Sequence, residues 1–185
     1  MYSTINTSIE RHRVEFNKYF EKLLSSHLSN NKLSKAMLYG TSNGGKRIRP
    51  YLIRTFGKIV NLPKKNCYQL SSAVECIHSY SLIHDDLPCM DDDDYRRGKL
   101  SVHKKFNEAQ AILAGDSLHD IAFEILSDLN GVIDPSLLTT LRLNILISFL
   151  LSLIVLLSLI VSKFFCINVG DTSGISNFYR FLRLL

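Results

Sequence analysis

The stretch that decides the fold is ECIHSYSLIHDDLPCMDDDDYRRGK, residues 75–99. It continues an apolar run that starts at Cys67, and a run of this length and composition predicts a buried helix. Pro88 cannot extend that helix, because proline lacks a backbone donor and its ring clashes with the preceding turn. We therefore predict a helix that runs towards Asp86 and breaks at Leu87-Pro88.

The second half of the stretch concentrates charge: six aspartates lie between residues 85 and 94, and three basic residues follow at once. Such carboxylates repel one another unless a cation lies among them, and magnesium binds carboxylate and phosphate oxygens together. The pattern favours a metal–phosphate site over a solvated acidic loop. A calcium loop of the EF-hand kind does not fit, since Arg96 and Val102 occupy its sixth and twelfth positions counted from Asp91.

Length and composition set broad limits. The 185 residues suffice for one domain with a sizeable core, or one domain with an appendage. The net charge of +5 forms no basic stripe, so we expect no nucleic-acid partner. The cysteines show neither zinc spacing nor disulfide density, which suits a reducing compartment; they are Cys67, Cys76, Cys89 and Cys166. Residues 1–10 lack a signal-peptide layout, so we expect a cytoplasmic location.

The first 130 residues predict helices almost throughout. Apolar residues at helical spacing indicate an amphipathic first helix; they are Val14, Phe16, Tyr19, Phe20, Leu23 and Leu24. Further helices are expected from Tyr51 to Val60, from a cap at Asn66 towards Asp86, and from Ser117 to Leu129. No segment alternates as a strand does, so an all-α fold is predicted.

Composition changes sharply past Pro135. Residues 143–162 contain no charge and consist almost entirely of Leu, Ile, Val and Ser. Twenty such residues would span a bilayer as a helix, and this is the one place where membrane contact is expected. Two alternatives stay open: a fully buried core helix, or translated sequence that never had to pack.

Two features add to the acidic run. Gly44-Gly45-Lys46-Arg47-Ile48-Arg49-Pro50 sets two glycines before three cations and a helix-starting proline, as an anion-binding loop requires. His78 lies seven residues before Asp85, so both point the same way on a regular helix. A satisfied structural histidine is the alternative reading of His78.

Three ordered segments, GGKRIRP (44–50), ECIHSYSLIHDDLP (75–88) and AILAGD (111–116), resemble the trans-prenyltransferases. The resemblance is closest to the bacterial farnesyl diphosphate synthases and covers roughly residues 10 to 130. It implies the N-terminal portion of an isoprenoid-synthase-type helical bundle. It also implies a reaction in which an allylic diphosphate ionises and isopentenyl diphosphate attacks the resulting carbocation.

The resemblance also implies roles for particular residues. Metal ligands for Mg²⁺ would be Asp85, Asp86 and Asp91. Catalysis would rest on Asp85, Asp91 and Arg96, with Arg96 contacting the allylic diphosphate. Isopentenyl diphosphate would be held by Lys46, Arg49, His78 and Arg97. Tyr80, one turn or more below Asp85, would limit product length to fifteen carbons, its alternative being an ordinary core tyrosine.

The family's second aspartate-rich motif is missing, since Asp171 is the single acidic residue after Asp134. We therefore expect a partial prenyltransferase domain over residues 1–135 and a divergent apolar tail over 136–185. Three hypotheses follow: a truncated or frameshifted synthase with impaired activity, a non-catalytic partner or regulatory subunit of a complete synthase, or a membrane-anchored remnant. The partners implied are the two diphosphates, with a homodimer as a further possibility.

Overall fold

The computed structural model describes residues 2–42, 44–59, 61–129, 139 and 142–143. The chain divides into Met1–Arg142 and Leu143–Leu185, and the description below concerns the first unit. The predicted boundary between residues 135 and 136, and the apolar segment 143–162 apart from Leu143, lie outside the described residues. Within the described part of the chain, no helix is both long enough and apolar enough to cross a membrane.

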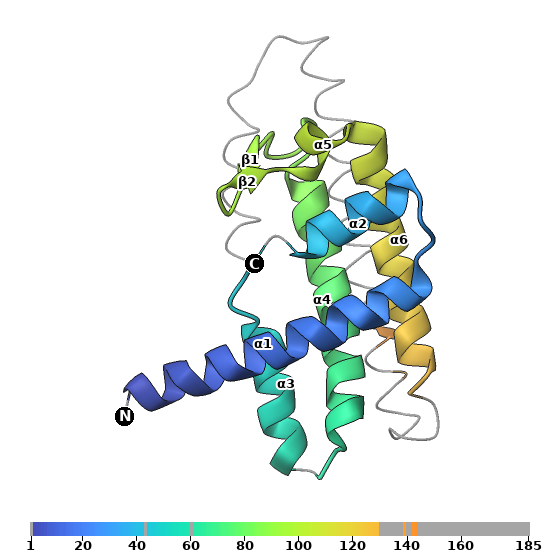
Figure 1. Ribbon diagram of the computed structural model, residues 1–185. Helices are drawn as coiled ribbons and strands as arrows, with labels where there is room; N and C mark the ends of the chain where they lie inside the picture. Colours follow the sequence, from blue (N-terminus) through green and yellow to red (C-terminus); the bar gives the residue numbers. More distant parts are fainter. Residues whose placement is uncertain (1, 43, 60, 130–138, 140–141, 144–185) are drawn as a thin grey trace. The chain divides into compact units, whose positions relative to one another are not determined.

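Six helices account for most of the described residues, which confirms the predicted all-α fold (Figure 1). They are α1 (Tyr2–His27), α2 (Lys32–Ser42), α3 (Ile48–Ile59), α4 (Lys64–Asp85), α5 (Val102–Lys105) and α6 (Glu108–Ser127). The most extensive helix–helix interface lies between α4 and α6. Helix α3 packs on α4, helices α2 and α5 pack on α6, and α1 contacts α3 and α4.

The core is formed by the apolar stripes that face these contacts. On α1 the stripe consists of Phe16, Phe20 and Leu24, spaced four residues apart and all nearly inaccessible to solvent. Val14, which the sequence pattern grouped with them, is 46% exposed. The α4–α6 interface buries small residues as well as large ones, so the two helices come close together; the smallest are Ala73, Ala111, Ala114 and Ala122.

The start of α6 differs from the prediction. The helix begins at Glu108, nine residues before the expected Ser117, and Asn107 caps it by accepting a hydrogen bond from the Gln110 amide at 2.7 Å. Gly115, which precedes the predicted start, lies inside the helix, where its lack of a side chain serves packing rather than a turn.

Other helix ends also differ from the prediction. Helix α4 begins at Lys64 after Pro63, so Asn66 is a buried residue inside the helix and not its cap. Helix α3 begins at Ile48, three residues before the expected Tyr51. Helix α2 was not predicted as a separate element.

A small hairpin contains the only strands among the described residues. Strands β1 (Tyr95–Arg96) and β2 (Lys99–Leu100) pair antiparallel. Arg97 and Gly98, with φ of +53° and +78°, form the two-residue turn between them. Two positive φ values in succession are those of the turn that matches the twist of a hairpin. Gly98 was its only signal in the sequence, since arginine rarely adopts this conformation.

Candidate active site

The helix break predicted at Leu87-Pro88 is present, and it returns the chain to the end of α4. Helix α4 ends at Asp85, and the next residues form successive turns. The Asp91 amide then donates a hydrogen bond to the Asp85 carbonyl at 2.9 Å. The break therefore brings Asp91 beside Asp85, although six residues separate them in sequence.

The electrostatics of this pair reflect crowding of like charge. Burial, and then the negative charge of Asp91, raise the pKa of Asp85 to about 6, against a smaller opposite effect of Arg96. A carboxyl group that is costly to ionise in the free protein gains when a cation binds it. Asp85 and Asp91 thus have the chemistry of a divalent cation site with oxygen ligands.

Asp86 does not join this pair. Its side chain is 3% exposed, and its two oxygens accept hydrogen bonds from Arg96 Nε at 2.7 and 2.8 Å. Arg96 in turn holds a raised pKa because of this contact. The predicted metal ligand and the predicted diphosphate contact therefore bind each other, and a bidentate pair of this kind fixes the hairpin to the end of α4.

The hairpin turn carries Arg97 to the glycine-rich loop. Arg97 Nη1 donates to the Gly44 carbonyl at 2.6 Å. A Cβ on Gly45 would lie 2.6 Å from the same nitrogen, and the φ of +119° at this position favours glycine, so the guanidinium lies directly against the loop backbone. This contact joins two segments that are separate in sequence, residues 44–49 and 95–98.

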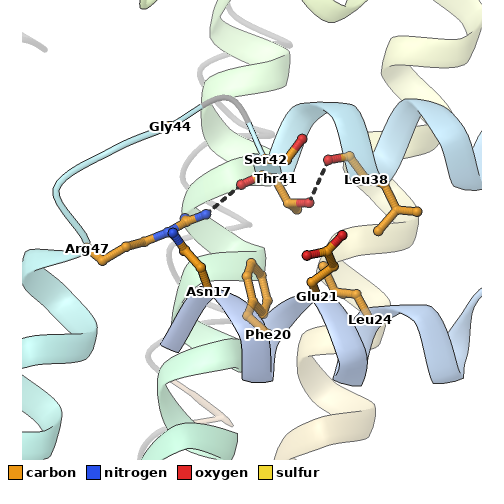
Figure 2. A pocket seen from close by; sticks show the side chains of 9 residues that line it. All are labelled: Asn17, Phe20, Glu21, Leu24, Leu38, Thr41, Ser42, Gly44 and Arg47. Atoms are coloured by element: carbon orange, nitrogen blue, oxygen red, sulfur yellow. Dashed lines mark hydrogen bonds between the residues drawn. The ribbon is translucent and has the colours of Figure 1, made fainter. Parts of the chain in front are cut away.

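Arg47, which the sequence reasoning did not select, is the inward-facing cation of that loop. Its Nη1 forms an ion pair with Glu75, its Nε donates to Asn17 Oδ1 at 2.9 Å, and its Nη2 donates to the Thr41 carbonyl at 2.7 Å. Figure 2 shows it at one side of a pocket of about 250 Å³ between α1 and α2. All three of its nitrogens are engaged, so Arg47 holds the loop in place instead of offering a free cation.

The remaining cations of the loop are placed differently. Lys46 and Arg49 are exposed, and Arg49 lies close enough to His78 to be one of the charges acting on it. Burial lowers the pKa of His78, and the positive charges of Arg49, Arg97 and Arg47 lower it further. Of the predicted set of Lys46, Arg49, His78 and Arg97, the charges of Arg49 and Arg97 act on His78, whereas Lys46 is not among the charges that shift its pKa.

Tyr80 lies on the buried side of α4, below the carboxylates. It is 5% exposed, and its ring meets the edges of two histidine rings, His84 at 4.7 Å and His119 at 5.5 Å between centroids. His119 comes from α6, so Tyr80 stands between the two central helices. This location agrees both with a wall below the site and with an ordinary core tyrosine.

His84 explains why Gly115 lies inside α6. A Cβ on Gly115 would overlap the His84 imidazole, whose Nε2 lies 3.1 Å from the Ile112 carbonyl and 3.9 Å from the Asp116 carboxylate. The glycine thus lets a side chain of α4 pack directly on the α6 backbone. Because His84 directly precedes Asp85, this contact also fixes the position of Asp85 and Asp91 along the axis of α6.

Comparisons with known proteins agree with this arrangement. A family model described as Polyprenyl synthetase matches residues 30–148. Farnesyl diphosphate synthase of Escherichia coli is 54% identical over 99 residues, covering 54% of this chain and 33% of that protein. The enzyme of the same name from Buchnera aphidicola subsp. Acyrthosiphon pisum is 46% identical over 118 residues, covering 64% and 42%.

Solved structures give the same result. An FPP/GFPP synthase from Zymomonas mobilis superposes with a TM-score of 0.71 at 39% identity, covering 80% of this chain and 54% of that one. A geranyltransferase from Legionella pneumophila gives 0.69 at 37% identity, covering 75% and 50%. The fold is thus that of the isoprenoid synthases. The chain belongs to the polyprenyl synthetase family, and it spans a third to two fifths of the length of the curated relatives named above.

Proposed function

We propose that this chain carries the diphosphate-binding part of a prenyltransferase that joins an allylic diphosphate to isopentenyl diphosphate. One observation carries the proposal: an acidic pair, Asp85 with Asp91, stands at the C-terminal end of α4, and a cationic group, Arg49 and Arg97 around His78, lies along the same helix. The first suits a metal-bound diphosphate and the second a diphosphate held by cations alone. The reaction would take place in the cytoplasm.

The residues present fit Mg²⁺ at the acidic pair. Asp85 and Asp91 supply oxygen ligands, and the negative charge of Asp91 is one cause of the raised pKa of Asp85. Asp86 is left out of the proposed ligand set, because Arg96 takes both of its oxygens. When bound, magnesium would neutralise charge on the departing diphosphate of the allylic substrate.

The chain's own cations would act on the second substrate. Lys46, Arg49 and Arg97 would hold the isopentenyl diphosphate, and His78 would add a hydrogen bond near them. Burial and neighbouring positive charge lower the pKa of Arg97, which signals a desolvated cation able to gain from an anion. Because isopentenyl diphosphate keeps its diphosphate group in this reaction, these cations would bind and orient that substrate rather than assist a leaving group.

Tyr80 would set the depth available to the growing prenyl chain. Its ring contacts the rings of His84 and His119 between α4 and α6, and it would close the space below Asp85. A product of fifteen carbons would follow, and substitution of Tyr80 by a smaller residue would lengthen it. We also propose that residues 1–135 form the prenyltransferase part of the chain and residues 136–185 a separate tail.

Calorimetry on the full chain tests the acidic pair. Titration of an allylic diphosphate with excess Mg²⁺ should give binding that Asp85→Ala and Asp91→Ala each weaken at least tenfold. Asp120→Ala, an exposed aspartate on α6, is the matched control and should leave binding unchanged. Equal binding by all four proteins would remove the assigned site.

A non-catalytic role is the second candidate, favoured by exposed apolar side chains on α3. Leu52, Phe56 and Ile59 are 45%, 63% and 73% exposed, which suits contact with a complete synthase or with a second copy in a homodimer. Product analysis separates the two roles. A fifteen-carbon diphosphate formed by the chain alone supports catalysis, whereas binding of both substrates without product supports the partner role.

A further inference from the structure

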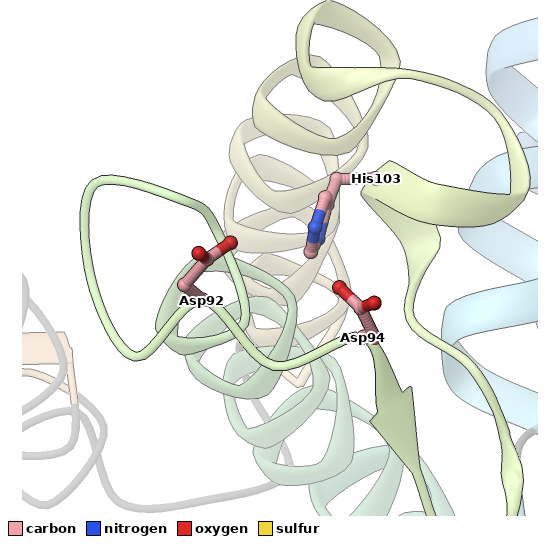
Figure 3. A group of neighbouring side chains, drawn as sticks. All are labelled: Asp92, Asp94 and His103. Carbon is pink, nitrogen blue, oxygen red and sulfur yellow. The ribbon is translucent and has the colours of Figure 1, made fainter.

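The hairpin brings together three metal-ligating side chains outside the acidic pair. Asp92, Asp94 and His103 each offer one ligand atom, and these atoms all lie within 4.8 Å of one another (Figure 3). Asp92 and Asp94 are exposed to solvent, and His103 is 6% exposed. An ion could therefore enter from solvent at the two aspartates, whereas the histidine side is covered by the protein.

His103 supplies an observation independent of the carboxylates. Its Nε2 is buried and has no hydrogen-bond partner within the described part of the chain. Such a buried polar atom is uncommon in folded proteins and calls for a ligand. Its other nitrogen, Nδ1, lies 3.1 Å from Ser101 Oγ. An Nδ1–H that donates to this oxygen leaves a lone pair on Nε2, which is the arrangement of histidines that bind metals.

The local backbone holds the carboxylates in position. The Ser101 amide donates to the Asp94 carbonyl at 2.9 Å, so Asp94 lies opposite the residue that orients His103. Asp92 has φ of +53°, an uncommon conformation for aspartate, and its amide donates to the Leu87 carbonyl at 3.1 Å. Backbone strain of this kind is found where a side chain must point in a particular direction.

We propose that Asp92, Asp94 and His103 bind a second divalent cation, separate from the one assigned to Asp85 and Asp91. One imidazole nitrogen with two carboxylates suits Mn²⁺, Co²⁺ or Zn²⁺ better than Mg²⁺, which binds oxygen almost exclusively. Ligand atoms around one such ion lie about 3–4 Å apart, so small side-chain rotations close the site. The ion pair between Asp94 and Lys104 Nζ, at 2.8 Å, is exposed and gives way to a stronger charge.

The site would strengthen the hairpin that carries Arg96 and Arg97. Arg96 on β1 reaches Asp86, and Arg97 in the turn reaches the Gly44 carbonyl. A metal ion that joins residue 92 to residue 103 would close the loop around the hairpin from outside. Its effect on the reaction would be to position these arginines rather than to contact the substrate.

Cobalt provides the direct test, because its visible spectrum reports ligand type and number. The full chain, with Mg²⁺ in excess, should bind one Co²⁺ through nitrogen and oxygen ligands. His103→Ala and Asp92→Asn should each weaken Co²⁺ binding at least tenfold, whereas Asp85→Ala should not. His27→Ala, a half-buried histidine on α1, is the matched control for the histidine.

A second readout keeps the test independent of folding defects. Circular dichroism checks the fold of each variant, and Asp92→Asn changes only an exposed side chain. Mn²⁺ should broaden the ring protons of His103 in the NMR spectrum of the unaltered chain before those of the other histidines. Unchanged Co²⁺ affinity in both variants, or loss of the nitrogen-ligand spectrum in Asp85→Ala instead, would overturn the proposal.

Discussion

Substitution of Gly115 by alanine tests the contact between Gly115 and His84, which positions Asp85 and Asp91 along α6. The new Cβ would overlap the His84 ring, which must then move away from the Ile112 carbonyl that it meets at 3.1 Å. Forcing a methyl group into a packed interface costs about 1–3 kcal/mol, and the lost hydrogen bond about 1 kcal/mol more. Alanine returns about 1 kcal/mol through its better helix propensity. The net loss of stability is about 1–3 kcal/mol.

Urea unfolding of four proteins isolates this contact in a double-mutant cycle. In the His84→Ala background the obstacle is gone, so Gly115→Ala should no longer destabilise and should gain up to about 1 kcal/mol. The coupling between the two positions is then about 2 kcal/mol or more. The reasoning is refuted if Gly115→Ala has the same effect on unfolding whether or not His84 is present.

Two further predictions concern charge. Arg96→Met should destabilise by about 3–5 kcal/mol in urea unfolding, because Asp86 is left buried without its partner; adding Asp86→Asn should recover most of that loss, and no recovery would contradict the pairing. Asp85→Asn should stabilise the metal-free chain by about 1–2 kcal/mol above pH 6, after allowance for solvent screening. Folding raises the pKa of Asp85, so the protonated carboxyl stabilises the folded chain below about pH 4, and this stabilisation is lost as the pH rises through about 6. A stability gain from Asp85→Asn that is equal at pH 4 and pH 7 would contradict the raised pKa.

The break at Pro88 shows what the sequence can predict well. A proline after a long apolar run excludes a regular helix whatever lies around it, so the return of Asp91 to Asp85 followed from local chemistry. The same holds for Phe16, Phe20 and Leu24 on α1, whose spacing predicted the buried face, although Val14 in the same pattern is exposed. Both features depend on residues close together in the chain.

Gly115 shows why other features were missed. Inside an apolar segment, a glycine reads as a break, because most helices avoid it. Its actual role depends on His84, which is distant in sequence and approaches only after α4 and α6 have packed. The hairpin at Arg97 has the same origin: its strands are two residues long, and the contacts of its arginines with Asp86 and Gly44 hold it in place.

Charge type does not reveal which charges support the structure and which are free to act. Arg47 and Arg49 stand two residues apart in one loop, yet Arg47 is buried on Glu75 while Arg49 is exposed near His78. Glu75 was the available signal, since an isolated glutamate in a buried helix needs a cation.

Asp85 and Asp86 differ in the same way, because only Asp86 meets an arginine. The two buried pairs, Arg47 with Glu75 and Arg96 with Asp86, are costly to desolvate and are held by several hydrogen bonds each. They fix the glycine-rich loop and the hairpin beside each other, where Arg97 donates to the Gly44 carbonyl. The half-buried Asp85 and the exposed Arg49 are therefore placed by neighbours of the same charge type, Asp86 and Arg47.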